Sequence, residues 1–382
     1  MLGPRTSKTF QEYIDTVFNV LQQLDLADRL DILWDTYIPD SLKAATRAKR
    51  GQGVKRKVTA TSSVPSNWQS FLHVDENKTQ LFHLLSEQVA SIAPDGKQVY
   101  STFDDRVLAS IDVEKSLIKP CKQEEADTSL VLYVLDAANK GHQHITVRTA
   151  DTDVVVIIVS HLHYIPASEV WVSFGVGKHQ RYIATHEIAP ALGSSRSKSL
   201  AIFHALTGCD VTSFFAGKGK KSAWDTWKVF PDVTDAFLML ADAPSLLPEN
   251  VMAILEKFVV LMYDRTSEFS TVNEARQHLF SRKGRTLKNI PPTQAALIQH
   301  VKHATYQGGH VWGLPSPGDW GWERKDGLSW NPMWTTLRQT QDSCYELIHC
   351  NCRKACKGLC KCYKASLKCT ALCHCEGNCF QD

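Results

Sequence analysis

Nine cysteines are concentrated near the end of this sequence. They lie between residues 350 and 379 with the spacing C-x-C-x3-C-x3-C-x-C-x6-C-x3-C-x-C-x3-C, while the other three of the 12 are scattered. Zn²⁺ takes four thiolate ligands in a tetrahedron, so nine thiolates can serve three ions only if three sulfurs each bridge two ions. The sequence therefore predicts a compact three-zinc cluster whose ligands are Cys350, Cys352, Cys356, Cys360, Cys362, Cys369, Cys373, Cys375 and Cys379.

The expected redox compartment supports metal rather than disulfides as the role of these cysteines. The first residues, MLGPRTSKTFQEY, lack the apolar segment of a secretory signal, and no uninterrupted apolar stretch reaches the ~18 residues that span a bilayer. We therefore expect an intracellular protein without a membrane partner, in the nucleus or, as the alternative, in the cytoplasm, where thiols stay reduced. A zinc-stapled tail that contacts other proteins stays open as an alternative, and a disulfide knot is least favoured.

Acidic side chains form a second set that could do chemistry. Asp151 and Asp153 stand immediately before the apolar run Val154–Val159, and residues two apart in a strand point to the same side. Two carboxylates ~4 Å apart repel by ~4 kcal/mol at an effective dielectric constant of ~20, and a divalent cation between them reverses the sign of that energy. Helix capping or a turn explains such a pair equally simply. The acids that accompany this pair are Asp35, Glu124, Glu125, Asp127 and Asp210.

The elements that would position these acids follow an α/β pattern. Apolar side chains recur at helical spacing in residues 9–24, RLDILWD is predicted as a short strand that ends at Asp35, and EEADTSLVLYVLDAANK is predicted as a helix. HITVRTA and EVWVSFG are predicted strands, and the apolar run after Asp151 is interpreted as a strand or its extension. Alternating strands and helices imply a mostly parallel sheet flanked by helices, with ligands at the carboxyl ends of its strands.

The chain is long enough for several folded parts, because it has 382 residues and is 43% hydrophobic. The predicted parts are an α/β domain at 9–230 with a basic insertion at 39–118, a helical extension at 231–310, a Trp-rich loop at 311–343 and a cysteine module at 344–382. Tryptophans of the loop are predicted to clamp it onto the domain, and a partner-binding surface is the alternative.

Basic residues are clustered rather than spread over the chain. The net charge is only +3, so any nucleic-acid surface must come from local clusters. Residues 43–57 and 352–369 both carry lysines and arginines without any acid. A solvated surface explains either cluster at least as well as a phosphate contact does.

Five segments, in this order, resemble the flap endonuclease/XPG-type nucleases of the PIN-like fold. The segments are LWDTYIPDSLKAATRAKR, EEAD, TADTDVV, IATHEIAPALG and FHALTGCDVTSFFAGKGKKSAW, and the resemblance spans residues 9–227. It implies Mg²⁺ or Mn²⁺ ligands at Asp35, Glu125, Asp127, Asp151, Asp153 and Asp210. It also implies that Lys43 and Arg50 hold the scissile phosphate, and that Lys218, Lys220 and Lys221 grip a duplex backbone.

The resemblance leaves two functions open. Two divalent ions held by clustered carboxylates would hydrolyse phosphodiester bonds by stabilising the attacking and leaving oxygens. The family, however, begins with a strand that bears another catalytic aspartate, and we expect this chain to lack that strand. The alternative is therefore a catalytically inactive protein that binds DNA or acts as a scaffold.

The cysteine segment resembles one repeat of the tesmin/TSO1-type CXC domain, including Tyr363 beside a C-x-C pair. Members of that family bind DNA through a three-zinc unit. Two spacers differ from the family pattern by one residue, and the usual second repeat is absent. The resemblance implies DNA contacts by Arg353, Lys354, Lys361 and Tyr363.

Overall fold

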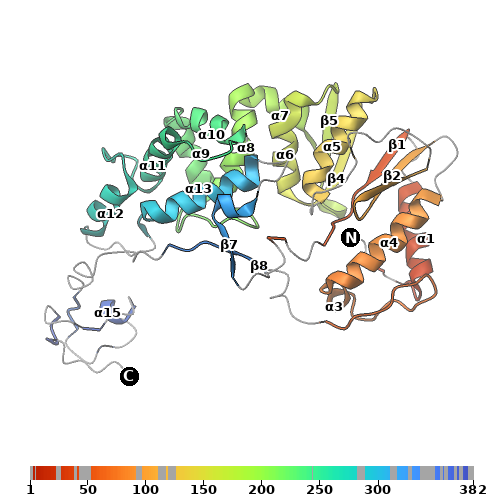
Figure 1. Ribbon diagram of the computed structural model, residues 1–382, viewed down its shortest axis with the longest axis horizontal. Coiled ribbons are helices and arrows are strands. Elements are labelled where there is room, and N and C mark those ends of the chain that lie inside the picture. The colour runs from red at the N-terminus through yellow and green to blue at the C-terminus, as the bar shows by residue number, and fades with distance from the viewer. Residues whose placement is uncertain are drawn as a thin grey trace.

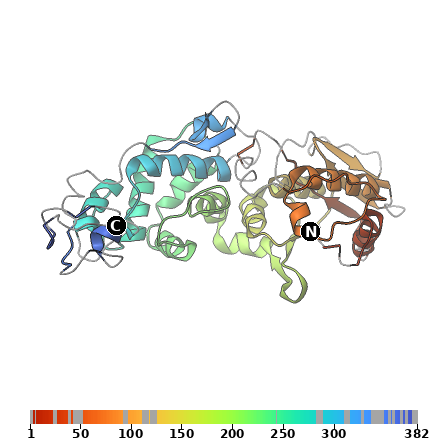
Figure 2. The ribbon, with the colours of Figure 1, turned by 90° about the horizontal axis from the view of Figure 1, so that it is seen from below.

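The structure is a computed structural model of the chain. The residues that it describes are 3–4, 6–22, 27–37, 41–42, 53–91, 97–110, 118, 126–242, 244–281, 289–309, 316–325, 329–335, 349–352, 356, 360–364, 368–369 and 373–376. The molecule is elongated, with a small sheet and its helices at one end and the cysteine module at the other (Figures 1 and 2).

The first sheet contains β1 (Arg29–Ile32), β2 (Gln98–Phe103) and β3 (Arg106–Ala109). β1 and β2 are parallel, and β2 and β3 form an antiparallel hairpin. Helices α1 (Phe10–Gln22), α3 (Trp68–Leu72) and α4 (Asp75–Ser91) pack with this sheet (Figure 1). Residues 39–118, predicted as an insertion above the core, thus supply two of the three strands.

The apolar spacing of α1 determines how it packs. Phe10, Tyr13 and Ile14 are at most 1% exposed and lie on one face of the helix. They form a core with Leu81 of α4 and Val99 of β2. The predicted helix at 9–24 is therefore confirmed over α1.

The second sheet follows with β4 (His144–Thr149), β5 (Glu169–Phe174) and β6 (Arg181–Ala184). β4 and β5 are parallel, while β5 and β6 are antiparallel. Helices α5 (Ala126–Asn139), α6 (Thr152–His161) and α7 (Thr185–Leu192) accompany it, with short 3-10 turns at Leu162–Tyr164 and Gly177–His179. The strands predicted at HITVRTA and EVWVSFG and the helix predicted over EEADTSLVLYVLDAANK are confirmed where the chain is described.

The apolar run after Asp151 is a helix, and its interpretation as a strand was wrong. Asp151 is the N-cap of α6, and its side chain accepts a hydrogen bond from the backbone N–H of Asp153. Val154 and Ile158, four residues apart, are at most 1% exposed and pack against β5 in the second core. Capping and this helical burial pattern outweigh the strand preference of β-branched side chains.

A buried charge network joins the first sheet to α5. The Nη1 of Arg29 in β1 lies 2.7 Å from the Oδ2 of Asp136 in α5, and both side chains are 4% exposed. Asp31 lies 2.9 Å from the Nε of Arg29, and Lys140 lies 3.0 Å from Asp136. The guanidinium also lies over the ring of Tyr100. Removing one member would leave an uncompensated buried charge, which is strongly destabilising.

A set of packed helices follows the second sheet. They are α8 (Ser194–Leu206), α9 (Lys220–Val229), α10 (Val233–Ala241), α11 (Glu249–Tyr263), α12 (Val272–Ser281) and α13 (Gln294–Gly309). α13 packs against α8, and a Cβ on Gly308 would lie 2.9 Å from the carbonyl oxygen of Ala201. Glycine is therefore required where these two helices meet.

Two tryptophans attach the segment after α13 to that helix. Trp320, in the 3-10 turn Pro317–Trp320, and Trp322 are at most 7% exposed and pack with Tyr306 of α13. β7 (Trp322–Lys325) and β8 (Ser329–Pro332) form an antiparallel hairpin. Clamping by tryptophans was the interpretation preferred for this region, and the described part of the segment agrees with it.

The fold class is mixed α/β, as predicted. The expected mostly parallel sheet is not formed by the described strands, because two of their five pairings are parallel and three are antiparallel. No helix in the described part of the chain is long and apolar enough to cross a bilayer.

We expect a pH-dependent stability from His300 of α13. Its ring is 9% exposed, its Nε2 lies 2.7 Å from the carbonyl oxygen of Leu206, and its Nδ1 lies 3.1 Å from the Ser213 hydroxyl. Burial lowers the pKa of His300 from 6.5 to about 4. The unfolded chain therefore binds more protons between these values, and stability falls as the pH drops through that window, by on the order of 3 kcal/mol.

Urea unfolding at about pH 7 and about pH 4.5 measures this effect. His300→Gln should be less stable at neutral pH and should lose less stability on acidification. The exposed His144 provides the control, because His144→Gln should keep the wild-type pH dependence. An unchanged pH dependence in His300→Gln would contradict the assignment.

Candidate metal centre and acidic edge

The cysteine module brings its sulfurs together in a small buried cluster. Cys350, Cys356, Cys360, Cys362 and Cys373 are at most 3% exposed. Cys352, Cys369 and Cys375 are partly buried and pack against the same cluster. Cys379, the ninth predicted ligand, lies outside the described residues.

Sulfur–sulfur distances in the module fit ligands of one ion and do not fit disulfides. The Sγ of Cys350 lies 3.5 Å from that of Cys356 and 3.9 Å from that of Cys369, and the Cys356–Cys369 distance is 3.6 Å. Four sulfurs at ~2.3 Å from a tetrahedral Zn²⁺ lie about 3.8 Å apart, whereas disulfide sulfurs are ~2.05 Å apart. The described cysteines are free thiols.

In the described part of the module, three overlapping groups of four cysteines have all their sulfurs within 4.8 Å of one another. The groups are Cys350, Cys356, Cys369 and Cys375; Cys350, Cys352, Cys356 and Cys360; and Cys350, Cys360, Cys362 and Cys369. Cys350 belongs to all three groups, whereas Cys352 belongs to one. The overlap shows that these sulfurs lie close enough together to share ions, so the donor set fits zinc.

Thiol ionisation in the module differs from site to site. Burial raises the pKa of Cys352 to about 11 and that of Cys369 to about 12. Burial also raises the pKa of Cys360. Hydrogen bonds to this thiol from the Tyr363 backbone and from neighbouring thiols outweigh burial and lower its pKa to about 6. A metal must therefore displace protons from the first two thiols, which couples metal binding to pH.

Basic and aromatic side chains of the module point to solvent. Lys361, Lys364 and Lys368 are exposed, and Tyr363 is 44% exposed. The first two lysines and the tyrosine lie on the short helix α15 (Lys361–Lys364), whose Cys362 is buried. Thiols thus face inward while cations face outward. Arg353 and Lys354, also predicted to contact DNA, lie outside the described residues.

Four of the predicted acidic ligands lie at the first turns of α5 and α6, and we call Asp35, Asp127, Asp151 and Asp153 the acidic edge. The Oδ1 of Asp35 accepts a hydrogen bond of 3.1 Å from the backbone N–H of Ala126, where α5 begins. Asp151 caps α6 with a bond of 2.8 Å to the N–H of Asp153. α5 and α6 lie side by side (Figure 1). Helix N-termini attract carboxylates, so these positions are explained without a metal.

Asp153 has a partner that sequence reasoning missed. Its Oδ1 lies 2.8 Å from the Nε2 of His204, and the two side chains are 30% and 14% exposed. His204 lies near the end of α8, which packs against α6. The available signal was a single histidine inside the apolar helix segment AIFHAL, three residues before the TGCD motif.

The described carboxylates do not form a site for a divalent ion. Among described residues, only cysteines supply three or more ligand atoms within 4.8 Å of one another. Asp210 is exposed in the loop after α8. Glu125, Lys43 and Arg50 lie outside the described residues, so the structure does not place these predicted site residues.

The three predicted hairpin lysines have different environments. Lys220 donates hydrogen bonds to the carbonyl oxygens of His204 and Gly208 and to the Thr207 hydroxyl, and burial lowers the pKa of Lys220. Lys221 is 92% exposed and pairs with Asp225. Lys218 lies over the ring of Tyr263.

Comparisons with family models, with curated proteins and with solved structures find no match for this chain. The geometry of the cysteine cluster is compatible with a CXC-like module. The PIN-like nuclease resemblance rests on the sequence motifs alone and stays a prediction.

We expect unequal zinc losses from two matched cysteine variants. Cys350→Ser removes a sulfur that lies within ligand distance of the sulfurs in all three candidate groups, so we expect it to remove a bridge between two ions and to lower the zinc content by more than one ion per chain. Cys352→Ser removes a ligand from one group, so it should lower the content by at most one. Native mass spectrometry of the reduced full-length protein measures both, with three ions expected in the wild type. Equal zinc contents in the two variants would contradict the shared role of Cys350.

A second pair of variants tests the position of Lys220. Lys220→Met removes one donor from three oxygens at the end of α8, so it should lower the free energy of unfolding by about 1–3 kcal/mol. Lys221→Met, at the exposed neighbouring position, should change it by less than about 0.5 kcal/mol. Urea unfolding measures both, and equal effects would show that Lys220 does not hold the end of α8.

Proposed function

We propose that this protein binds nucleic acid, with DNA as the preferred form, through a zinc-stabilised basic cysteine module. The observation that carries the proposal is the overlap of three four-cysteine groups at Cys350 beneath an exposed basic surface. We also propose that the module holds three zinc ions and that the protein acts in the nucleus. The module is joined to an α/β domain with the ancestry of a PIN-like, metal-dependent structure-specific endonuclease.

Charge explains how such a module would hold nucleic acid. Three Zn²⁺ supply +6 and nine thiolates supply −9, which leaves the cluster at −3. Six cations of the segment exceed this charge, namely Arg353, Lys354, Lys357, Lys361, Lys364 and Lys368. The loaded module therefore has a net positive charge that attracts phosphates. The exposed ring of Tyr363 adds a surface on which a base or sugar can pack.

The ancestry of the α/β domain is supported by the gathering of acids at the N-termini of α5 and α6. Hydrolysis itself has less support, because Asp35 and Asp151 cap helices and Asp153 pairs with His204. No hydrolytic step is assigned to carboxylates that do not share an ion site. A catalytically inactive DNA-binding or scaffolding protein is therefore the better supported form, and an Mg²⁺- or Mn²⁺-dependent endonuclease is the second candidate.

DNA binding by the full-length protein should weaken steeply as salt rises. Fluorescence anisotropy with a labelled duplex gives the slope of log K against log salt, which becomes less negative by about 1 for each phosphate contact removed. Lys361→Gln and Lys364→Gln should each produce this change, while Lys178→Gln, on an exposed turn of the α/β domain, should not. Zinc removal by a chelator should abolish the same binding. Tight binding that survives zinc removal would contradict the role of the module.

Cleavage of flapped and branched DNA with Mn²⁺ tests the second candidate. We expect weak cleavage or none, and any true activity should be lost in Asp153→Ala. At position 151, serine is a better test than alanine, because Asp151→Ser removes the negative charge but keeps an N-cap for α6. Strong cleavage that both variants abolish would establish the enzyme. Cleavage that neither variant changes would come from another site or from a contaminant.

A further inference from the structure

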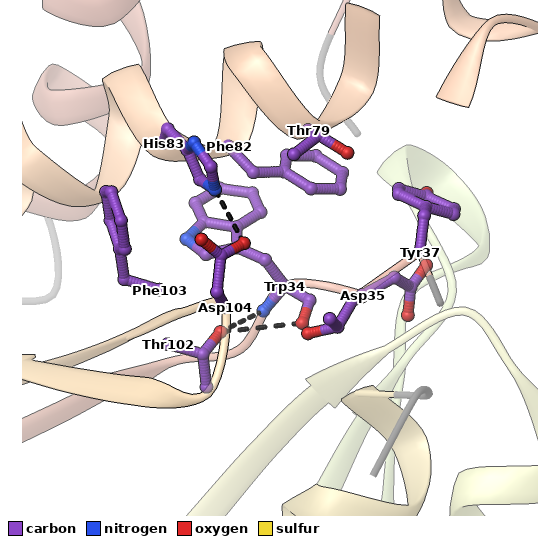
Figure 3. Close-up of a pocket in the computed structure, with 10 residues that line it drawn as sticks. Trp34, Asp35, Tyr37, Thr79, Phe82, His83, Thr102, Phe103 and Asp104 are labelled. Carbon is purple, nitrogen blue, oxygen red and sulfur yellow. Dashed lines mark hydrogen bonds and ion pairs between the residues drawn. The ribbon is translucent and has the colours of Figure 1, made fainter. Parts of the chain in front are cut away.

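A pocket lined by aromatic rings and carboxylates lies between the end of β1, helix α4 and the β2–β3 hairpin (Figure 3). Trp34, Tyr37 and Phe82 supply aromatic rings, and Asp35 and Asp104 supply carboxylates. Neither the cysteine module nor the proposed DNA contacts involve this pocket. It lies beside the acidic edge, because Asp35 belongs to both.

The aromatic wall of the pocket is held in place before any ligand arrives. The backbone N–H of Trp34 donates to the Thr102 hydroxyl at 2.8 Å, and its indole N–H donates to the Ser101 hydroxyl at 3.1 Å. Phe82 is 8% exposed and stacks on Trp34 with ring centroids 4.9 Å apart. A ligand that packs on these rings therefore orders few side chains on binding.

The carboxylates of the pocket are also fixed. Asp104 has a φ of 51°, an uncommon value for a residue other than glycine, and its Oδ1 lies 2.7 Å from the Nε2 of His83 (Figure 3). Asp35 is held through its bond to the N–H of Ala126. The second oxygen of each carboxylate makes no further hydrogen bond with a described residue and can accept one from a ligand.

This combination of groups selects an organic cation. Two carboxylates repel phosphate, and aromatic faces attract positive charge. Lys78 already covers one face of Tyr37, with its Nζ 4.1 Å from the ring centroid, so this ring shows that the wall attracts cations, and a ligand must pack on the other faces of the wall. A metal ion would gain little from rings, because it needs several oxygen or nitrogen ligands at once. Hydrophobic rings beside acids instead suit a flat cation with several donors.

We propose that this pocket binds the guanidinium group of an arginine side chain presented by a partner polypeptide. Guanidinium is planar, stacks on aromatic faces and donates two parallel hydrogen bonds to a carboxylate. Asp104 is 48% exposed, so the pocket is open to a side chain that enters from solvent. This inference does not depend on the proposed DNA binding, and either can fail without the other.

Titration of the full-length protein with three capped tripeptides, followed by NMR, tests the assignment. The peptides are acetyl-Gly-Arg-Gly-amide, its lysine counterpart and its citrulline counterpart, which has nearly the shape of arginine without the charge. We expect the arginine peptide to bind at least tenfold more tightly than the citrulline peptide, and more tightly than the lysine peptide. Free guanidinium ion, as a further probe, should bind more weakly than the arginine peptide.

Variants locate the binding on the protein. Asp104→Asn removes one charge and keeps a residue that tolerates positive φ, so it should reduce arginine-peptide affinity at least fivefold without unfolding the hairpin. Trp34→Leu should reduce it further. Trp334→Leu, at a tryptophan that is 73% exposed and does not line the pocket, should leave it unchanged. Equal binding of arginine and citrulline peptides, equal binding of free guanidinium, or unchanged affinity in Asp104→Asn would overturn the proposal.

Discussion

Thiolates packed within 4 Å of one another repel unless a cation lies between them. The proposed function depends on zinc ions that offset this repulsion in the cysteine module. Among the described residues of the segment, the buried side chains are the cysteines themselves. Structural zinc can supply on the order of 10 kcal/mol of folding free energy for each site in small domains. We therefore expect the module to fold only when it binds metal. Once the sulfurs are buried around the ions, the lysines are left on the surface of the module.

A related constraint organises the acidic edge. Helix N-termini have unsatisfied N–H groups, and Asp35 and Asp151 each accept a hydrogen bond from one of them, in α5 and α6 respectively. The same carboxylates that the nuclease resemblance assigns to metal ions thus have structural partners in the described chain. His204 beside Asp153 reinforces this account, because it supplies a donor to the remaining carboxylate of the D-x-D pair. Acids can persist at such an edge for folding even if catalysis has been lost.

Local patterns predicted the elements whose signals were unambiguous. The spacing of Phe10, Tyr13 and Ile14 identified α1, and the cysteine spacing identified a cluster that the structure brings together. The helix α6 was missed because its β-branched composition favours a strand, while the decisive cap depends on the side-chain geometry of Asp151. The sheet contribution of residues 98–109 was missed because pairing with β1 joins segments about seventy positions apart. His204 and the aromatic pocket are contacts between distant segments, which periodicity cannot show.

Zinc K-edge X-ray absorption on the zinc-loaded full-length protein tests the central claim most directly. The account predicts a first shell of four sulfurs at about 2.3 Å around each ion, without nitrogen or oxygen ligands. It also predicts scattering from neighbouring zinc ions, since Cys350 and its neighbours are shared between groups. A first shell that contains nitrogen or oxygen, or isolated zinc ions without a metal neighbour, would contradict a cluster built on bridging thiolates.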